Sequence, residues 1–312
     1  MSSIKQNPGD TNIYLYVESS WYRYDSTAEP LGEGAMGIVW MGFNCDSGEK
    51  VAIKQIRPEL CGIPMIRARA KLEATLVVNH PHVVRMLGYC EDSPSEGPLY
   101  IISEYVSGIT MAEHVETQLA RFSVEERDRK IAQEFLPVVD AVGALHAQGI
   151  IHRDIKPSNI MLQDGYLPKL MDLGIAKADR FFDAHLCGTI GSPPFAAPEQ
   201  IVPDNVESVV DARSDIYSLG VTLSYLAGSK YPLDAYVHSA KLVDIITVAT
   251  AKKPEDRFSD TAQLKEALED YISDLSDEAE TKNAARHTYS LPLMMTGALI
   301  AILAIILIVL CH

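Results

Sequence analysis

The sequence predicts an α+β fold of two lobes, a small β-rich lobe followed by a larger helical one, with a single transmembrane helix after them. Three observations support this prediction. Short apolar runs broken by Gly, Asn and Asp fill residues 21–106, apolar residues recur at helical spacing after residue 111, and residues 291–311 are almost entirely apolar. A chain of 312 residues is also long enough for two packing units.

The first lobe is expected to consist of strands with one helix. Residues 1–20 form a polar lead that contains Pro8-Gly9, and we expect this lead to be loosely held. The helix is expected near Arg67–Val78. Short apolar runs predict strands that include Gly37–Gly42, Lys50–Lys54 and Leu99–Ile102.

The second lobe is expected to be helical. The spacing of three and four is clearest for Ile131, Phe135, Val138, Val139, Val142 and Leu145. We therefore expect one domain over residues 21–273, with the β-rich lobe at about 21–106 and the helical lobe at about 107–273. An acidic linker over residues 274–290 follows this domain.

Composition excludes several classes of protein. Charged residues make up 22% of the chain, which rules out wholesale disorder. The 42 acidic residues against 27 basic ones give a net charge of −15, and this argues against nucleic acid as a partner, because phosphate backbones need a positive field. The five cysteines include no Cys-x-x-Cys pair, so neither a disulfide framework nor a zinc site is expected.

Residues 291–311 are predicted to cross a membrane. No charged residue occurs between Leu291 and Leu310, and twenty helical residues span about 30 Å, the thickness of the hydrocarbon layer. A buried core helix would normally keep a polar stripe, and a removable lipid-anchor signal would need a longer polar spacer, so both alternatives are less favoured. Small residues on this helix (Gly297, Ala301 and Ala304) leave a homodimer open.

The topology follows from the other end of the chain. Residues 1–20 contain no apolar segment of the kind that directs export. We therefore expect a cytoplasmic body attached to the bilayer by a C-terminal anchor.

A glycine-rich turn in the first lobe is the first motif that indicates chemistry. Gly32, Gly34 and Gly37 lie across a strand, a turn and a second strand, where the lack of Cβ lets backbone N–H groups approach a polyphosphate. A dinucleotide-binding fold would place a helix directly after such a motif, and here a strand follows. Lys54 then ends the next apolar strand.

A second group of polar residues follows the predicted helix of the second lobe. Asp154, Lys156 and Asn159 lie in one short segment, and Asp172 comes thirteen residues after Asn159. Asp154 can orient a hydroxyl and Lys156 can neutralise a phosphate. Asn159 and Asp172 supply the hard oxygen ligands that Mg²⁺ prefers. Together with the glycine turn and Lys54, they predict a site for phosphoryl transfer.

The glycine-rich turn, the strand lysine and the two later groups of polar residues follow one another in the order typical of the eukaryotic-type (Hanks-type) protein kinase family. The chain resembles this family, and within it the serine/threonine branch common in bacteria. The resemblance covers about residues 21–272. It implies a two-lobed protein kinase fold that uses ATP and Mg²⁺ (or Mn²⁺) to phosphorylate Ser and Thr of protein substrates. It also implies membrane-anchored signalling, for which a bacterial inner membrane is the expected location.

The resemblance also implies individual roles. The ATP-binding residues would be Leu31, Gly32, Gly34, Gly37, Val39, Ala52, Lys54, Ser103 (the gatekeeper), Glu104, Val106 and Met161. The catalytic residues would be Asp154, Lys156, Lys54 and Glu73, which would hold Lys54, and the metal ligands would be Asn159 and Asp172. Structural roles would fall to Glu199, its partner Arg257, and Asp215, which would brace the catalytic loop.

The activation segment is expected to carry two hydroxyl residues of interest. Thr189 is the expected phosphorylation site, since Arg153 beside Asp154 would pair with a phosphate there. A plain loop threonine is the alternative. Ser192 would face the substrate near the acceptor site.

The sequence departs from the family pattern at four places, one of which is the extra residues Thr189-Ile190-Gly191 ahead of Ser192. Glu73 lies about two residues closer to His80 than usual, Leu173 replaces the commoner Phe, and the region Tyr231–Pro254 is short. Two other functions remain open. The chain could be a membrane-anchored pseudokinase or scaffold that binds nucleotide without turnover, or a kinase of small molecules, although the segment that ends in Glu199 accompanies protein substrates.

Overall fold

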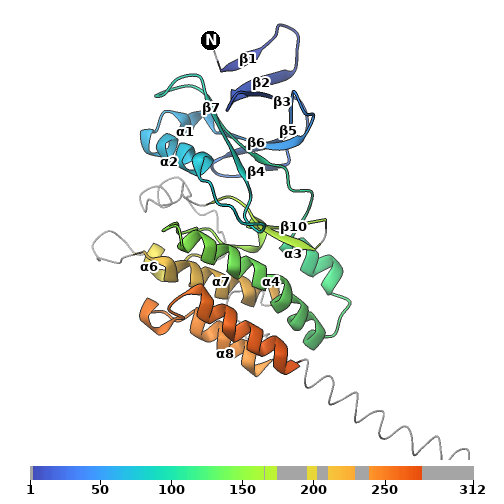
Figure 1. Ribbon diagram of the computed structural model, residues 1–312, viewed down its shortest axis with the longest axis vertical. Helices are drawn as coiled ribbons and strands as arrows, with labels where there is room; N and C mark the ends of the chain where they lie inside the picture. Colours follow the sequence, from blue (N-terminus) through green and yellow to red (C-terminus); the bar gives the residue numbers. More distant parts are fainter. Residues whose placement is uncertain (1–2, 165, 174–194, 202–209, 229–238, 276–312) are drawn as a thin grey trace, which may run out of the picture.

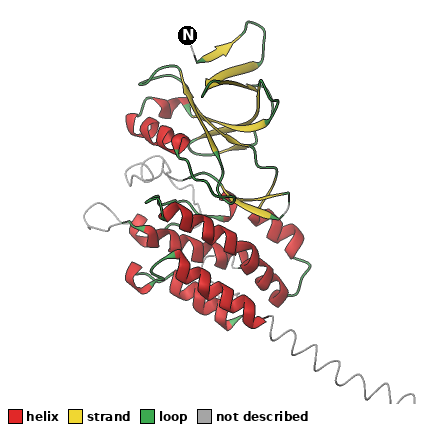
Figure 2. Cartoon of the chain, in the orientation of Figure 1, coloured by secondary structure: helices red, strands yellow, loops and turns green. Residues whose placement is uncertain are grey.

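The computed structural model of the chain describes residues 3–164, 166–173, 195–201, 210–228 and 239–275. Figure 1 shows two lobes, a strand-rich one that carries the N-terminus and a helical one below it. Figure 2 makes the division plain, because the strands gather in the first lobe and the long helices in the second. Two predicted sites, Thr189 and Ser192, and the predicted span at 291–311 lie outside the described residues.

An eight-stranded antiparallel sheet forms the first lobe. Its order is β1-β2-β3-β5-β6-β8-β7, with β4 paired to β5. The runs expected at Gly37–Gly42, Lys50–Lys54 and Leu99–Ile102 are confirmed as β5, β6 and β8. The strands are β1 (Ile4–Gln6), β2 (Asn12–Val17), β3 (Ser20–Asp25), β4 (Gly32–Glu33), β5 (Gly37–Asn44), β6 (Lys50–Ile56), β7 (Met86–Glu91) and β8 (Leu99–Glu104).

The N-terminal residues differ from the expected loose lead. β1 and β2 form a hairpin that pairs through β3 with the rest of the sheet. Leu15 and Val17 are buried among core residues of β6 and β8, and a Cβ on Gly88 would come within 2.6 Å of Val17. The alternation of apolar and polar residues in β2 is short, so the polar composition of residues 1–20 concealed it.

Two helices pack on one face of this sheet, α1 (Pro58–Cys61) and α2 (Pro64–Thr75). α2 begins and ends three residues before the expected range. Pro64 sets its start, because proline is favoured in the first helical turn. Leu76 has an extended backbone and ends the helix, and β-branched Val77 and Val78 follow it.

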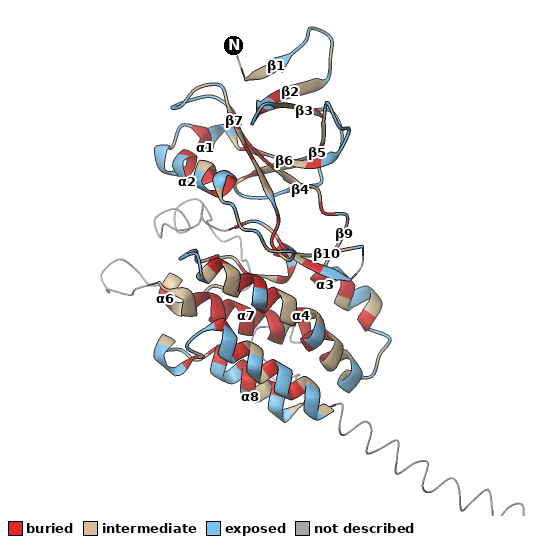
Figure 3. Cartoon of the chain, in the orientation of Figure 1, coloured by how far each residue is buried: buried red, intermediate tan, exposed pale blue. Residues whose placement is uncertain are grey.

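The second lobe is helical, as expected. Ser123 and Glu126 form a capping box at the start of α4. Most residues of α7 are buried, and Figure 3 shows this helix almost entirely in the colour of buried residues. The helices are α3 (Met111–His114), which continues as a wider turn at Val115–Leu119, α4 (Val124–His146), α6 (Pro198–Ile201), α7 (Ala212–Leu226), α8 (Ala240–Ala249) and a helix over residues 261–275. Short 3₁₀ turns lie at Pro157–Asn159 and Pro254–Asp256.

A small sheet joins the two lobes. It has the order β11-β10-β9, with β9 at Gly108–Thr110, β10 at Ile160–Gln163 and β11 at Leu167–Leu170. A parallel bridge between Val83 and Leu170 ties β11 to the segment that precedes β7. β10 and β11 thereby place the segments on either side of them, residues 152–159 and 171–173, next to the first lobe.

Among the described residues, no helix has both the length and the apolar character needed to cross a bilayer.

Candidate active site

Lys54 belongs to the first lobe and contacts a residue of the second. It lies on β6, and its Nζ atom is 3.1 Å from Oδ1 of Asp172, which follows β11 in the second lobe. The same Nζ atom is 3.8 Å from Oε1 of Glu73, in the last turn of α2. The structure therefore brings together the lysine and both of its expected acidic neighbours, although Glu73 lies closer to His80 than the family pattern suggests.

Burial and charge shift the pKa values of these three groups. Burial acts to lower the pKa of Lys54, but the negative charges of Asp172 and Glu73 outweigh it and raise that pKa, so the ammonium stays charged. The Lys54 charge lowers the pKa of Asp172, which keeps this carboxylate ionised. Glu73 is only 3% exposed, and burial raises its pKa to about 7 against the opposing effect of Lys54.

The segment between α4 and β10 carries the other expected catalytic groups. Asn159 donates from Nδ2 to the backbone oxygen of Asp154 at 2.9 Å and to its Oδ2 atom at 2.8 Å. Lys156 lies 3.2 Å from the same Oδ2 atom. One oxygen of the Asp154 carboxylate therefore contacts both an amide and a cation, in an arrangement that can orient a hydroxyl and neutralise a phosphate.

Asp215 of α7 braces this segment from below. Its carboxylate accepts the backbone N–H of His152 at 2.7 Å and that of Arg153 at 2.8 Å. Arg153 has a φ of +64°, a strained conformation for a residue with a side chain. His146, at the end of α4, also contacts the Asp215 carboxylate at 2.8 Å. Sequence reasoning identified Asp215 but missed His146, which no motif marks.

The residues expected around adenine come from facing strands of both lobes. Ala52 pairs with Ser103 across β6 and β8, and Val39 pairs with Lys54 across β5 and β6. Val106 is buried just after β8. In the second lobe Met161 lies on β10, where it pairs with Lys169 of β11 and Thr110 of β9.

Glu104, expected at the hinge, uses its side chain to join the lobes. Its Oε1 atom lies 2.5 Å from Nζ of Lys169 and accepts the backbone N–H of Arg85 at 2.9 Å. The Glu104 backbone N–H donates to the Arg85 oxygen. The side chain and the backbone N–H of Glu104 are therefore both engaged in these contacts.

The three glycines of the turn do not share one role. A Cβ on Gly37 would come within 2.2 Å of the Gln55 backbone oxygen, so Gly37 is required by the close approach of β5 and β6. A Cβ on Gly32 or Gly34 would meet nothing within 4 Å, so their small size serves something other than packing. Leu31 is 47% exposed at the start of this turn and is held by its N–H to the Val39 oxygen.

Arg57 holds this turn and was missed by sequence reasoning. Its Nε atom donates to the Gly34 oxygen at 3.0 Å, and an NH2 atom contacts Glu33 at 2.7 Å. Its backbone N–H donates to the Met36 oxygen. Since Arg57 follows Lys54 by three residues, one strand end carries both the lysine and the contact that fixes the glycine turn.

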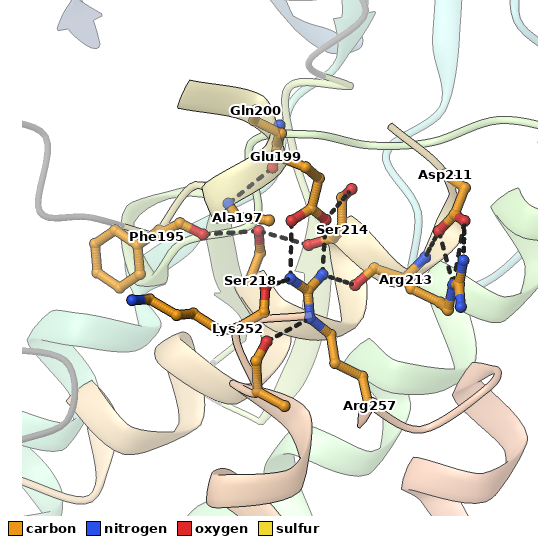
Figure 4. A network of polar contacts seen from close by, with 11 residues as sticks. Phe195, Ala197, Glu199, Gln200, Asp211, Arg213, Ser214, Ser218, Lys252 and Arg257 are labelled. Carbon is orange, nitrogen blue, oxygen red and sulfur yellow. Dashed lines mark hydrogen bonds and ion pairs between the residues drawn. The ribbon is translucent and has the colours of Figure 1, made fainter. Parts of the chain in front are cut away.

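A polar network surrounds Glu199 and Arg257 in the second lobe, as Figure 4 shows. Arg257 donates to both carboxylate oxygens of Glu199, at 2.7 and 2.8 Å, and its other donors reach the backbone oxygens of Ala251, Lys252 and Arg213. Ser214 donates to Glu199 at 2.7 Å. Burial acts to raise the pKa of Glu199, but the Arg257 and Ser214 bonds outweigh it and hold that pKa low. The ion pair implied by the resemblance is present.

The donor set fits Mg²⁺. Asn159 uses its Nδ2 atom on Asp154, which leaves its oxygen for a cation, and Asp172 uses Oδ1 on Lys54, which leaves Oδ2. Among the described residues no group of three or more His, Cys, Asp and Glu could hold a metal ion. Two protein ligands supplemented by phosphate oxygens and water are how Mg²⁺ is usually bound beside a nucleotide.

Comparison with known proteins supports the same conclusion. The protein kinase domain family matches residues 26–289. The chain is 32% identical over 272 residues to the serine/threonine-protein kinase Pkn1 of Myxococcus xanthus, and the aligned region covers 77% of this chain and 37% of that protein. It is 33% identical over 268 residues to the serine/threonine-protein kinase PknB of Mycobacterium leprae, and the aligned region covers 76% of this chain and 41% of that protein.

A solved structure is also similar. The PknI kinase domain of Mycobacterium tuberculosis superposes with a TM-score of 0.59 at 25% identity, over 80% of this chain and 95% of that domain. The chain spans about two fifths of the length of the two curated relatives. The resemblance inferred from the motifs is confirmed: this chain belongs to the protein kinase domain family, alongside bacterial serine/threonine-protein kinases.

Proposed function

We propose that the protein transfers the terminal phosphate of ATP, with Mg²⁺, to serine or threonine hydroxyls of protein substrates. The observation that carries this proposal is the convergence of Lys54, Asp172 and Glu73 from both lobes, next to the Asp154–Asn159 contact. A protein that used the fold only as a binding surface would not require these charged groups to lie together. The relatives named serine/threonine-protein kinases support the choice of acceptor.

Each side chain has a role in this proposal. Asp154 orients the acceptor hydroxyl and takes its proton as the oxygen–phosphorus bond forms and ADP leaves. Lys156, beside it, neutralises charge on the transferred phosphate. Lys54 binds the other phosphates and Glu73 holds Lys54, while Asn159 and Asp172 hold the metal. Bound Mg²⁺ supplies charge neutralisation of the phosphates.

The exposed turn provides the remaining contacts. Gly32 and Gly34, which packing does not require to be small, allow backbone N–H groups to approach the phosphates. The adenine ring would lie among Leu31, Val39, Ala52, Val106 and Met161, with Ser103 at its rear and the backbone of Glu104 and Val106 at its edge.

The test uses the full chain in detergent with Mg²⁺, labelled ATP and casein as a generic acceptor. Wild type is expected to label casein on Ser and Thr, and Asp154→Asn and Lys54→Met to label it at least about 100-fold less, because both remove groups that act in the transition state. Equal labelling by wild type and Asp154→Asn would overturn the proposal. Tight nucleotide binding without any transfer would identify a pseudokinase instead.

We also propose that residues 291–311 anchor the protein in a membrane, with the kinase domain in the cytoplasm. The absence of charge between Leu291 and Leu310 supports this. Cells that express the full chain, and cells that express it with Ile302→Arg and Ile306→Arg, are compared by carbonate extraction of membranes. The full chain should stay in the membrane pellet and the double variant should leave it. Release of both chains would refute the anchor.

Phosphorylation of the protein's own activation segment is a further part of the proposal. Thr189 is the proposed site, and Ser192 is proposed to serve near the acceptor hydroxyl of the substrate. Arg153, held beside Asp154, is the proposed partner of the phosphate. Mass spectrometry of active protein should find phosphate on Thr189 that Asp154→Asn lacks. Full activity without phosphate on either hydroxyl would contradict this.

A further inference from the structure

Arg67 is a buried arginine on α2, outside the motifs that define the site. It is 2% exposed, and each of its five N–H donors has an acceptor. Two of these are Oε2 of Glu91, at 2.7 Å from NH2, and the oxygen of Cys61, at 3.1 Å from NH1. The others are backbone oxygens of the β7–β8 turn, those of Ser93, Pro94 and Gly97.

These bonds tie α2 to structures on two sides. Glu91 ends β7 and residues 93–97 belong to the turn that leads into β8, so one guanidinium connects the helix to the edge of the sheet. The Cys61 bond connects the same helix to α1. A guanidinium with every donor satisfied has one favourable position, because a small displacement breaks several bonds at once.

The position of α2 matters because Glu73 lies near its end. Only Ala74 and Thr75 follow Glu73 in the helix, and the last turn of a helix frays most easily. No side chain caps the N-terminal end of α2, and its last turn contains no basic residue. Packing of Ile66, Ala70 and Ala74 against the sheet also restrains this helix.

We infer that Arg67 is a positioning residue for the active site, which holds α2 where Glu73 contacts Lys54. This inference rests on the proposed function, since it assigns Arg67 a role in phosphoryl transfer. Arg67 touches neither Lys54 nor Glu73 and acts through the helix that carries Glu73. The turn over residues 92–98 is therefore part of the machinery that keeps Lys54 in place.

Lys71 provides a matched control on the same helix. Its Nζ atom contacts Oε1 of Glu91 at 2.6 Å, but its side chain is 25% exposed and reaches no backbone oxygen of the turn. Lys71→Gln thus removes a cation from the same carboxylate without disturbing the bonds to the turn. It is expected to change activity by less than about twofold, as partly exposed ion pairs contribute little.

The test is a double-mutant cycle between Arg67 and Glu73 in the full chain, with kcat/KM for ATP as the readout. Arg67→Lys keeps the charge and loses the planar fork of donors. It should lower kcat/KM about tenfold in the wild-type background and less than about twofold in the Glu73→Gln background, because its effect passes through Glu73. Equal reductions in both backgrounds, or no reduction in the wild type, would overturn the inference.

Hydrogen exchange provides a readout that does not depend on turnover. Backbone amides of residues 70–76 should exchange faster in Arg67→Lys than in wild type and Lys71→Gln, with the second lobe unchanged. Unchanged exchange there would refute the anchoring role even in an inactive protein. If wild type itself transfers no phosphate, the proposed function fails, and this measurement still decides whether Arg67 holds α2. Should Arg67→Lys not fold, Glu91→Gln replaces it in both measurements with the same expected outcomes.

Discussion

Each lobe contains a buried glutamate opposite a cation, and the two pairs are built differently. In the helical lobe, Glu199 receives two bonds from Arg257 at 2.7 and 2.8 Å. In the β-rich lobe, Glu73 lies 3.8 Å from Lys54, which is beyond hydrogen-bonding distance. Both carboxylates are nearly inaccessible to solvent, so the difference lies in how completely their charges are satisfied.

The pKa values of Glu199 and Glu73 shift in opposite directions for this reason. Bonds to Glu199 overcome the effect of burial and lower its pKa, whereas burial raises the pKa of Glu73 to about 7 despite Lys54. A saturated pair is fixed in place. A cation that is only loosely paired can still turn to a phosphate, and Lys54 already divides its charge between Glu73 and Asp172. The comparison thus separates a pair that stabilises the lobe from one that serves the chemistry.

The largest expected effect comes from breaking the saturated pair. Arg257→Met leaves Glu199 charged and without its main partner, and should lower the free energy of unfolding by about 3–5 kcal/mol. Denaturant unfolding of the full chain in detergent measures this value. Arg213→Gln is the control, since Arg213 pairs with Asp211 in a partly exposed position, and should cost less than about 1 kcal/mol. Equal losses for both variants would contradict the comparison.

Breaking the loose pair should affect catalysis more than stability. Glu73→Gln keeps the shape of the side chain and removes its charge, so Lys54 loses one of its two restraints. We expect kcat/KM for ATP to fall about 10- to 100-fold, equivalent to about 1.4–2.7 kcal/mol, while the free energy of unfolding falls by less than about 1 kcal/mol, because burial already disfavours the ionised Glu73 carboxyl. Steady-state kinetics and denaturant unfolding on one preparation decide this. A large loss of stability at unchanged kcat/KM would reverse the two assigned roles.

The pH dependence of stability should distinguish the same two glutamates. The folded pKa of Glu73 is about 7, above its ordinary value of 4.5. Its contribution to stability is therefore fully present below about 4.5 and is lost as the pH rises through 7, where the carboxyl must ionise while buried. The melting temperature of Glu73→Gln minus that of wild type should therefore be more positive at pH 8 than at pH 6.

Glu199 supplies the control for that measurement. Its pKa is lowered, so it is ionised at both pH 6 and pH 8, and the difference in melting temperature between Glu199→Gln and wild type should be the same at both. A pH-independent difference for Glu73→Gln as well would show that Glu73 does not titrate in this range.

The smallest expected effect concerns the glycine turn. Arg57 is partly exposed, and so is its partner Glu33, so the contact contributes modestly. Arg57→Gln releases the Gly34 oxygen and should raise KM for ATP about two- to threefold with kcat unchanged. Initial rates over a range of ATP concentrations test this. Glu29→Gln, an exposed change before the same turn, should leave KM unaltered.

Much of the site could be predicted from sequence because its residues lie in short motifs whose spacing is set by chemistry. Asp154 and Asn159 are five residues apart, and the geometry that joins them is local. Glu73 was identified by elimination as the only acid in its region, and the structure places it beside Lys54. The strands β5, β6 and β8 were visible because apolar runs between turn residues are a strong signal.

The parts that could not be predicted depend on backbone atoms or on distant partners. Four of the five acceptors of Arg67 are backbone oxygens, which any residue type supplies, so the sequence carries no trace of them. His146 reaches Asp215 across 69 residues and belongs to no motif. The hairpin of β1 and β2 was hidden by its polar composition, since only Leu15 and Val17 of β2 are buried.

The hairpin at the start of the chain also constrains the order of folding. The Ser3 hydroxyl donates to the Glu91 oxygen, 88 residues away, and Val17 fits against Gly88 of β7. During synthesis, β1 and β2 leave the ribosome long before β7 and cannot complete their contacts with β7 until it has emerged. Contacts so distant in sequence slow folding, because a long loop must close before they form. The contacts between this hairpin and β7 are thus expected to be among the last to form in a refolding experiment.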